Sequence, residues 1–186
     1  MKLFKLLLGL AIFPLVLSSC TNSLNSEEKQ LVGTWYLAAT EEMEEDEMSG
    51  IVSIEGTTQY LKDKTSKSAG KMTLLMEIGD DYYGNYAIVN LTYTFNMSGS
   101  WEIENGYITE YVENIDIKLS KVSSTGTDNE NELNKIMEEY ALASIPELKS
   151  ELLGEQKSKI SKFSQNEITI IDEEEGKEMT YKRISK

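Results

Sequence analysis

Side chains able to perform acid–base or nucleophilic chemistry form a restricted set in this chain. The sequence has 32 acidic residues and 10 tyrosines, but it has no histidine, and its only cysteine is Cys20. The absence of histidine excludes Ser-His-Asp and Cys-His catalysis and removes the commonest metal ligand. A single cysteine excludes an internal disulfide and a cysteine-based zinc site. Catalysis would have to rely on carboxylates, tyrosines or lysines, so we expect a protein that is not an enzyme and that binds no cofactor or metal.

The cysteine stands at the end of an apolar N-terminal stretch. Lys2 and Lys5 lie at the start of a segment whose remainder, up to residue 17, is almost wholly apolar. This order is that of a secretory signal peptide, and residues 17–20 (Leu-Ser-Ser-Cys) resemble the lipobox of bacterial lipoproteins. The resemblance implies cleavage before Cys20 and acylation of that cysteine. Because the apolar segment is shorter than the roughly 20 residues of a membrane-spanning helix, residues 1–19 are interpreted as a cleaved signal peptide.

The charge of the chain limits its partners. The formal net charge is −14, and removal of Lys2 and Lys5 makes it more negative. Nucleic acids and anionic lipid surfaces both favour clusters of basic residues, so we expect neither as an electrostatic partner. Acyl chains on Cys20 are the expected membrane attachment. Residues 20–30 are interpreted as the lipidated cysteine and a polar tether, in which a short helix could begin at Glu27. Thr21 is not the aspartate that retains some lipoproteins at the inner membrane, so we expect a place in the cell envelope at the outer membrane.

From residue 31 onward, apolar and polar residues alternate as they do in half-buried strands. The alternation is clearest in residues 90–97, and Ser98-Gly99 is interpreted as a turn before a further short strand. Asn105-Gly106 is a strong hairpin signal. Counting such segments and the short turns between them predicts a mainly β domain over residues 31–186. The predicted fold is an antiparallel up-and-down β-barrel of about eight strands.

One segment, at about 129–162, departs from this alternation. Leu133, Met137 and Ala141 repeat at helical spacing, and Pro146 is placed to open a second helix in its first turn. We therefore predict a pair of helices inserted before the last hairpin of the barrel. Two roles for this insertion remain open: its apolar stripe either packs on the barrel or forms a lid over the barrel mouth.

Residues near the two ends of the domain resemble a known family. Gly33-Thr34-Trp35 starts the first strand and resembles the Gly-x-Trp motif of lipocalins and of bacterial lipocalin-like lipoproteins. The only arginine, Arg183, lies in the last strand, where that family keeps a basic residue that packs over the tryptophan. The resemblance implies a lipocalin-like barrel closed by Gly33, Trp35 and Arg183. Helices placed before the last hairpin depart from the topology of vertebrate-type lipocalins.

The parity of the last strand supports the same contact. Met179 and Tyr181 set its inward side, and Arg183 shares that side. A guanidinium that faces a core needs partners, and stacking on an indole supplies one, worth roughly 2 kcal/mol when desolvated. The alternative for Arg183 is a solvated position near the C-terminus. The alternative for the fold is a β-sandwich or an open sheet curled around the helices.

The interior of an eight-stranded barrel is either filled by side chains or just large enough for one small ligand. The alternation predicts an inward set rich in aromatic residues and methionine, which suits an adaptable apolar pocket as well as an ordinary core. The candidates are Met72, Leu74, Met76, Leu91, Tyr93, Phe95, Tyr107 and Tyr111. We therefore weigh two functions. One is a lipid-anchored protein that binds a small apolar or amphipathic ligand, and the other is a structural envelope lipoprotein with a filled barrel and a protein partner.

Overall fold

The computed structural model describes residues 24–45, 48–80, 85–172 and 176–185, and the predicted signal peptide and Cys20 lie outside these ranges. The strands are β1 (Gly33–Glu45), β2 (Met48–Tyr60), β3 (Thr65–Asp80), β4 (Asn85–Glu104), β5 (Tyr107–Thr125), β6 (Gly154–Phe163), β7 (Glu167–Ile171) and β8 (Glu178–Ser185). Each strand pairs antiparallel with the next, and β8 pairs with β1. The prediction of an up-and-down barrel of about eight strands is confirmed, and the closure by β8 rules out an open sheet.

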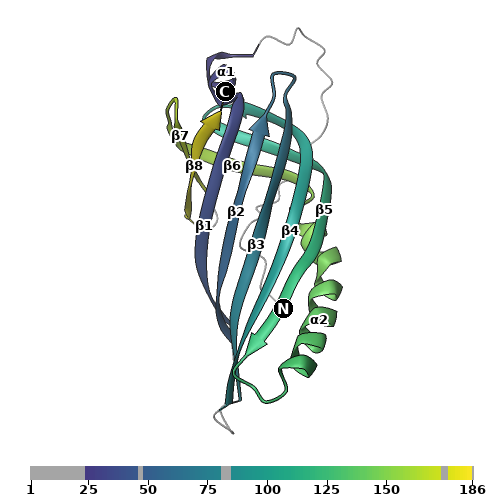
Figure 1. Cartoon of the computed structure of the whole chain (residues 1–186). Helices are drawn as coiled ribbons and strands as arrows, with labels where there is room; N and C mark the ends of the chain where they lie inside the picture. The colour runs from purple at the N-terminus through teal and green to yellow at the C-terminus, as the bar shows by residue number, and fades with distance from the viewer. Residues whose placement is uncertain (1–23, 46–47, 81–84, 173–175, 186) are drawn as a thin grey trace.

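The barrel is closed over only part of its length. β5 pairs with β6 through residues 107–112, and β1 pairs with β8 only from Thr34 to Leu37. Beyond this ring, β1–β5 continue as a curved sheet, in which β4 and β5 pair as far as Ile88 and Thr125. Figure 1 shows these long strands extending below the ring, with α2 (Glu130–Leu152) beside β5. We call the closed end upper and the other end lower, following this view.

α2 covers the inner face of the lower sheet, where the ring has no strands. Its buried residues Met137, Ala141 and Leu148 pack against inward-facing side chains of β3, β4 and β5. The strand residues of this group, which we call the lower core, are Met72, Leu74, Met76, Val89, Leu91, Tyr93 and Ile117. The Tyr93 hydroxyl also donates a hydrogen bond to the carbonyl oxygen of Ala141 (3.4 Å). The apolar stripe therefore packs on the barrel, which is the first of the two roles considered for the insertion.

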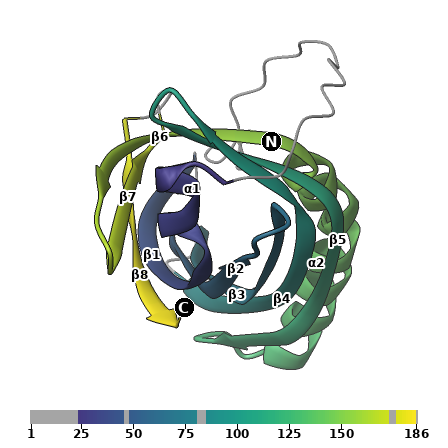
Figure 2. The ribbon, with the colours of Figure 1, turned by 90° about the horizontal axis from the view of Figure 1, so that it is seen from above.

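A second apolar group, the upper core, fills the closed ring. It consists of Leu24, Leu31, Trp35, Tyr60, Trp101, Ile103, Ile108, Ile168 and Ile170. α1 (Ser26–Leu31) lies across the upper end of the ring (Figure 2). The side chain of Asn25 accepts a hydrogen bond from the N–H of Glu28, and the Glu28 carboxylate accepts one from the N–H of Asn25 (both 2.8 Å), which caps α1. Burial alone would raise the pKa of Glu28, but hydrogen bonds from Lys64 and Asn25 lower it overall.

Residues 24–31 belong to the folded domain rather than to the tether predicted over 20–30. Leu24 and Leu31 are buried in the upper core, and residues 26–31 form α1. Two leucines seven positions apart are enough to seat a short capped helix on the ring. They are too few to produce an apolar period, so the polar composition of the segment indicated a tether instead.

The helical segment is shorter than predicted and forms one helix instead of two. α2 passes through Pro146 without a break and ends at Leu152. Proline removes the backbone hydrogen bond to the carbonyl of Leu142, and both residues lie on the exposed side of the helix, so the loss is tolerated. Residues 154–162, which were predicted as helix, belong to β6 (Gly154–Phe163). The inward positions of β6 are occupied by polar residues such as Gln156, so the strand has no apolar alternation to detect.

β4 runs without a break through Ser98-Gly99, although these two residues were predicted to form a turn. A Cβ atom at Gly99 would lie 1.8 Å from the carbonyl oxygen of Tyr111 on β5, so only glycine fits this approach. The approach coincides with a β-bulge, because Gly99 pairs with Val112 and Ser98 pairs with Asn114. The predicted number of strands is nevertheless right, because β6 replaces the short strand that merges into β4.

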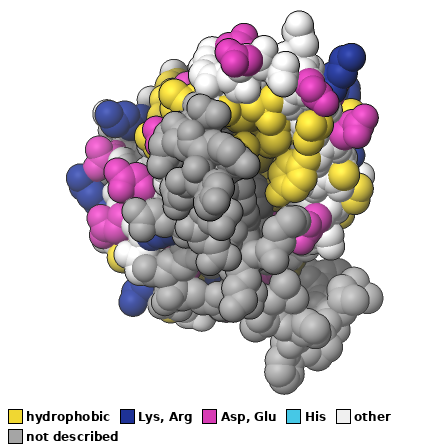
Figure 3. Space-filling view, turned by 90° about the horizontal axis from the view of Figure 1, so that it is seen from below, with side chains coloured by type: hydrophobic (Ala, Val, Ile, Leu, Met, Phe, Trp, Pro, Cys, Tyr) yellow, Lys and Arg dark blue, Asp and Glu magenta, His cyan; other side chains and the backbone are white. Residues whose placement is uncertain are grey.

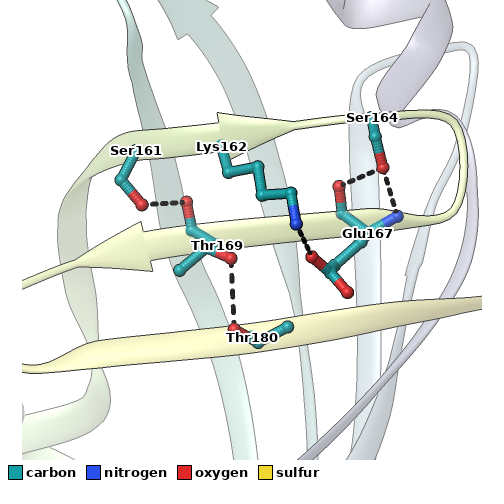
Figure 4. Close-up of polar contacts among 6 residues, drawn as sticks. All are labelled: Ser161, Lys162, Ser164, Glu167, Thr169 and Thr180. Atoms are coloured by element: carbon teal, nitrogen blue, oxygen red, sulfur yellow. Dashed lines mark hydrogen bonds and ion pairs between the residues drawn. The ribbon is translucent and has the colours of Figure 1, made fainter.

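Polar side-chain contacts hold the last three strands together (Figure 4). The Ser164 hydroxyl accepts a hydrogen bond from the N–H of Glu167 (3.0 Å) and donates one to its carbonyl oxygen (3.1 Å). Lys162 forms an ion pair with the Glu167 carboxylate. The hydroxyls of Thr169 and Thr180 lie 3.1 Å apart across β7 and β8. These contacts support a strand, β7, that is only 5 residues long.

Candidate functional site

A cavity of about 210 Å³ lies inside the barrel. All eight strands and α2 contribute to its lining, and its neighbours include Ile170 of the upper core and Met72 and Leu148 of the lower core. The cavity therefore lies between the two cores. The apolar part of its wall includes Leu37, Ile54, Phe95, Met97, Val112 and Met179. Aromatic and methionine side chains of this kind form apolar walls that adapt to a ligand.

The ring above the cavity is closed by a stacked pair of side chains. The guanidinium carbon of Arg183 lies 4.0 Å from the centroid of the Trp35 ring, and the two residues are partners in the β1–β8 register. Trp35 is fully buried, and its indole N–H donates to the carbonyl oxygen of Leu31 (2.7 Å). Arg183 donates to the carbonyl oxygens of Gln30 and Val32, which replace the water lost on burial. The contact predicted between Trp35 and Arg183 is therefore present, and we call it the closure pair.

The connection from α1 into β1 explains the glycine that precedes Trp35. Gly33 has a φ of 140°, a value that residues with a Cβ atom rarely adopt. Just before it, the N–H of Val32 still bonds to the carbonyl oxygen of Glu28 at the end of α1. Gly33 therefore turns the chain directly from the helix into the strand and places Trp35 under Arg183.

A group of polar side chains borders the cavity on its upper side. Glu110 of β5 lines the cavity and is the register partner of Trp101 on β4 and of Gln156 on β6. Its carboxylate shares a hydrogen bond with the Tyr60 hydroxyl, and Tyr181 lies near enough to interact with its charge. Gln156 also lines the cavity, and its amide nitrogen has no hydrogen-bond partner among the described residues. We call Tyr60, Glu110, Gln156 and Tyr181 the polar group.

Burial strongly changes the acidity of this group. Loss of water raises the pKa of Glu110 from 4.5 to about 7, and the hydrogen bond from Tyr60 offsets the rise only in part. Burial and the nearby charge of Glu110 raise the pKa values of Tyr60 and Tyr181 well above the ordinary value of 10. The two tyrosines therefore remain hydrogen-bond donors at every ordinary pH, whereas Glu110 changes charge close to neutrality. Glu110 retains some accessible area because it borders the cavity.

Six of the eight predicted cavity residues face the barrel interior, but only half of these border the cavity. Met72, Tyr93 and Phe95 line it. The other three, which pack in the lower core against α2, are Leu74, Met76 and Leu91. The same alternation therefore placed both sets of side chains on the inner face, and the position of α2 decides which of them meet the cavity.

The prediction was wrong for Tyr107 and Tyr111, which lie on the outer face of β5. The ammonium nitrogen of Lys157, an exposed residue, lies 4.8 Å from the centroid of the Tyr107 ring. The Tyr111 hydroxyl donates a hydrogen bond to the carboxylate of Glu102 (3.1 Å). Neither tyrosine lines the cavity.

The β-bulge in β5 caused this error. Ile115, Ile117 and Leu119 alternate on one side of β5, and Tyr107 and Tyr111 share their parity in the sequence, but Glu113 is an extra residue between two paired positions. An extra residue moves every side chain on its far side to the opposite face. The residues that take the inward positions are Ile108, Glu110 and Val112.

Sequence reasoning missed Glu110, although a signal for it exists. Residues on either side of the Asn105-Gly106 turn pair with each other, so Ile103 lies opposite Ile108 and shares its face. Counting two residues on from Ile108 places Glu110 on the inner face. Gln156 had no comparable signal, because its strand was not predicted.

Other features of the described structure do not offer a better site. A wider hollow of about 650 Å³ on β1–β5 is bordered by exposed polar residues such as Gln59, Lys67 and Asn96. Within the described ranges, no group of three or more acidic, cysteine or histidine residues is placed to hold a metal ion. None of the described helices is long and apolar enough to cross a membrane.

No protein-family model matches this chain, and no curated protein is significantly similar to it.

Proposed function

We propose that this chain is a non-catalytic, lipid-anchored protein of the cell envelope whose barrel binds one small amphipathic molecule. The observation that carries the proposal is the cavity between the upper and lower cores. Its wall is largely apolar and carries Glu110, Gln156 and Tyr181 of the polar group. An apolar body would therefore find contacts along the wall, and a polar end would find hydrogen-bonding groups beside Glu110 and Tyr181.

The volume of the cavity limits the size of the ligand. An engineered apolar cavity of about 150 Å³ can hold benzene, and pockets for drug-sized molecules begin at about 300 Å³. A cavity of about 210 Å³ lies between these two cases. The expected ligand is thus somewhat larger than benzene and much smaller than a long-chain fatty acid, unless a flexible part of it extends out of the barrel.

The anchor rests on the sequence around Cys20. The lipobox resemblance supports acylation there. The closure pair of Trp35 and Arg183 agrees with the resemblance to the lipocalin-like family, and that family includes lipoproteins. A Cys20→Ser variant, expressed in a bacterium that processes lipoproteins, should leave the membrane fraction. Mass spectrometry of the unaltered protein should find an N-terminus at Cys20 with the mass of attached acyl chains. A chain that retains residues 1–19 would contradict the anchor.

Ligand binding can be tested with the chain from residue 21 onward, which contains every described contact of the fold. Native mass spectrometry of this chain should show additional bound mass or uptake of small apolar compounds. Ala39 lines the cavity, whereas its neighbour Ala38 is exposed. Ala39→Phe should fill the cavity and abolish uptake, and Ala38→Phe should not. Equal uptake by both variants would place the ligand outside the barrel.

A second function, binding of another envelope protein, is favoured by the surface of α2. Ile136 and Leu142 are 56% and 50% exposed, and Tyr140 is 42% exposed. Figure 3 shows hydrophobic side chains gathered on the molecule seen from below, with acidic side chains beside them. Cross-linking in the envelope should capture a specific partner, and Ile136→Ser should weaken the capture without loss of folding. An unchanged capture would remove this candidate.

A further inference from the structure

Glu110 is placed where a ligand inside the cavity would meet it. It lies on the inner face of β5 between Trp101 and Gln156, its register partners on the neighbouring strands. It lines the cavity together with Gln156 and Tyr181. The fold thus sets a carboxylate into the wall of an otherwise largely apolar space.

The charged groups around this carboxylate do not balance it. Among the described residues that line the cavity, Lys157 is the only cation, and it is exposed, with its ammonium over the ring of Tyr107 on the outer face of β5. The other titratable residues of the lining are Tyr93 of β4, Asp172 after β7 and Tyr181 of β8. Tyr60 of β2 contacts Glu110 from the upper core. The lining residues of β1, β3, β4 and α2 include no acid or base apart from Tyr93, whose hydroxyl bonds to Ala141.

We propose that Glu110 receives the polar end of the ligand, and that it selects a protonated primary amine attached to a small apolar body. This inference rests on the proposed ligand-binding function. A carboxylate in an apolar space is costly unless a cation pairs with it. The described residues supply no such cation from within the cavity, and an ammonium group on the ligand would supply it.

The neighbours of Glu110 suit an ammonium group, which has three N–H donors and no acceptor. The carboxylate can accept one donor and the Tyr181 hydroxyl oxygen another. The Gln156 amide can accept the third, because a half-turn about its last bond puts its oxygen where the unpartnered nitrogen now lies. In its present orientation the same amide nitrogen is a donor that lacks an acceptor among the described residues, so Gln156 can receive an ammonium only after this half-turn.

The charges also discriminate against other polar ends. A ligand carboxylate would face Glu110 and Asp172 across a small space, and the net charge of −14 opposes its approach. An alcohol fits without repulsion but leaves the carboxylate without a counter-ion. The order of affinity for ligands with the same apolar body is therefore amine, then alcohol, then carboxylate.

Proton release should accompany amine binding. Burial raises the pKa of Glu110 to about 7, whereas pairing with an ammonium requires the ionised carboxylate. The ionised fraction rises about tenfold between pH 6 and pH 8, and the apparent affinity for an amine should rise by the same factor. Tyr60 and Tyr181 do not titrate in this range, because burial raises their pKa values.

Calorimetric titration of the chain from residue 21 onward can test the inference with hexylamine, hexanol and hexanoate. At pH 7.5 hexylamine should bind at least tenfold more tightly than hexanol, and hexanoate should bind least. Glu110→Gln should lower the affinity for hexylamine to that for hexanol and leave hexanol unaffected. Glu77→Gln, which removes an exposed acid on the outer face of β3, is the matched control and should change neither.

The outcomes separate this inference from the proposed function. If hexanol binds but hexylamine is not preferred, or if Glu110→Gln keeps the preference, the role of Glu110 is wrong while ligand binding stands. If none of the three compounds binds, both proposals fail. Should Glu110→Gln not fold, the unaltered chain still decides the matter, because an affinity for hexylamine that does not change between pH 6 and pH 8 contradicts the pairing with Glu110.

Discussion

The upper and lower halves of the barrel exclude water by different means. In the upper half, backbone hydrogen bonds run around the whole ring from β8 to β1, and the closure pair lies at that junction. In the lower half, β1–β5 are joined by hydrogen bonds, but the remaining side is covered by Met137, Ala141 and Leu148 of α2. Hydrogen bonding thus fixes the width of the upper half, whereas side-chain packing sets that of the lower half. The cavity lies where the two arrangements meet.

The largest effect should come from breaking the upper half. Trp35 is fully buried and stacks under Arg183, so Trp35→Ala should lower the free energy of unfolding by about 3–5 kcal/mol. Urea unfolding followed by circular dichroism measures this change. Tyr36→Ala, at the neighbouring outward position, which is 37% exposed, is the control and should cost much less. Equal costs would show that the closure pair does not hold the ring.

The polar group between the two halves should make stability depend on pH. Because the pKa of Glu110 rises from 4.5 to about 7 on folding, the folded state binds more protons than the unfolded state between these values. Stability should therefore fall as pH rises from 4.5 to 7, by about 3 kcal/mol at 1.36 kcal/mol per pKa unit. Glu110→Gln should remove this slope, and Glu77→Gln should keep it. If the stability of Glu110→Gln still falls over this pH range, the fall comes from general repulsion among the 32 acidic residues and not from Glu110.

The lower half should be weakened by a smaller change in α2. Leu148 is 3% exposed and touches both the lower core and the cavity. Leu148→Ala should cost about 2–3 kcal/mol, near the low end for such substitutions, because the side chain already borders empty space. The same variant should bind larger ligands than the unaltered chain does. Leu142→Ala, on the exposed side of α2, should change stability by no more than about 0.5 kcal/mol.

The smallest effect should come from a change within the closure pair. Arg183→Lys keeps the positive charge but loses the flat group that stacks on Trp35 and donates to Gln30 and Val32. We expect a loss of about 1–2 kcal/mol in thermal or urea unfolding. Lys182→Arg, at the exposed neighbouring position, provides the control. No loss in Arg183→Lys would mean that charge alone closes the ring.

The sequence predicted the inner face of the lower half and the closure pair better than the rest of the upper half. Regular alternation in β4 and the shared parity of Tyr181 and Arg183 are local signals, and both led to the observed inner face. The pairing of the first and last strands then follows from the up-and-down order. A short helix near Glu27 was foreseen, but the burial of Leu24 and Leu31 on the ring escaped prediction, because two apolar contacts leave no periodic pattern.

The candidate site was harder to predict because its residues break the patterns that reveal strands. Gln156 and Ser158 occupy inward positions of β6 because they border a cavity rather than a core, so the strand looked polar and non-alternating. A β-bulge cannot be detected from the alternation of apolar and polar residues. The bulge at Glu113 therefore led to the wrong face for Tyr107 and Tyr111. The residues most relevant to binding were therefore the ones that apolar periodicity could not find.

The burial of Leu24 constrains how the protein would be oriented if Cys20 were anchored to a membrane. Only three residues separate Leu24 from Cys20, and four Cα–Cα steps of 3.8 Å span at most about 15 Å. If acyl chains hold Cys20 among the lipid headgroups, the end of the barrel that carries α1 must face the bilayer at close range, with α2 and the long strand tips directed toward the aqueous compartment. With so short a linker, the barrel would keep one orientation relative to the bilayer instead of reorienting freely.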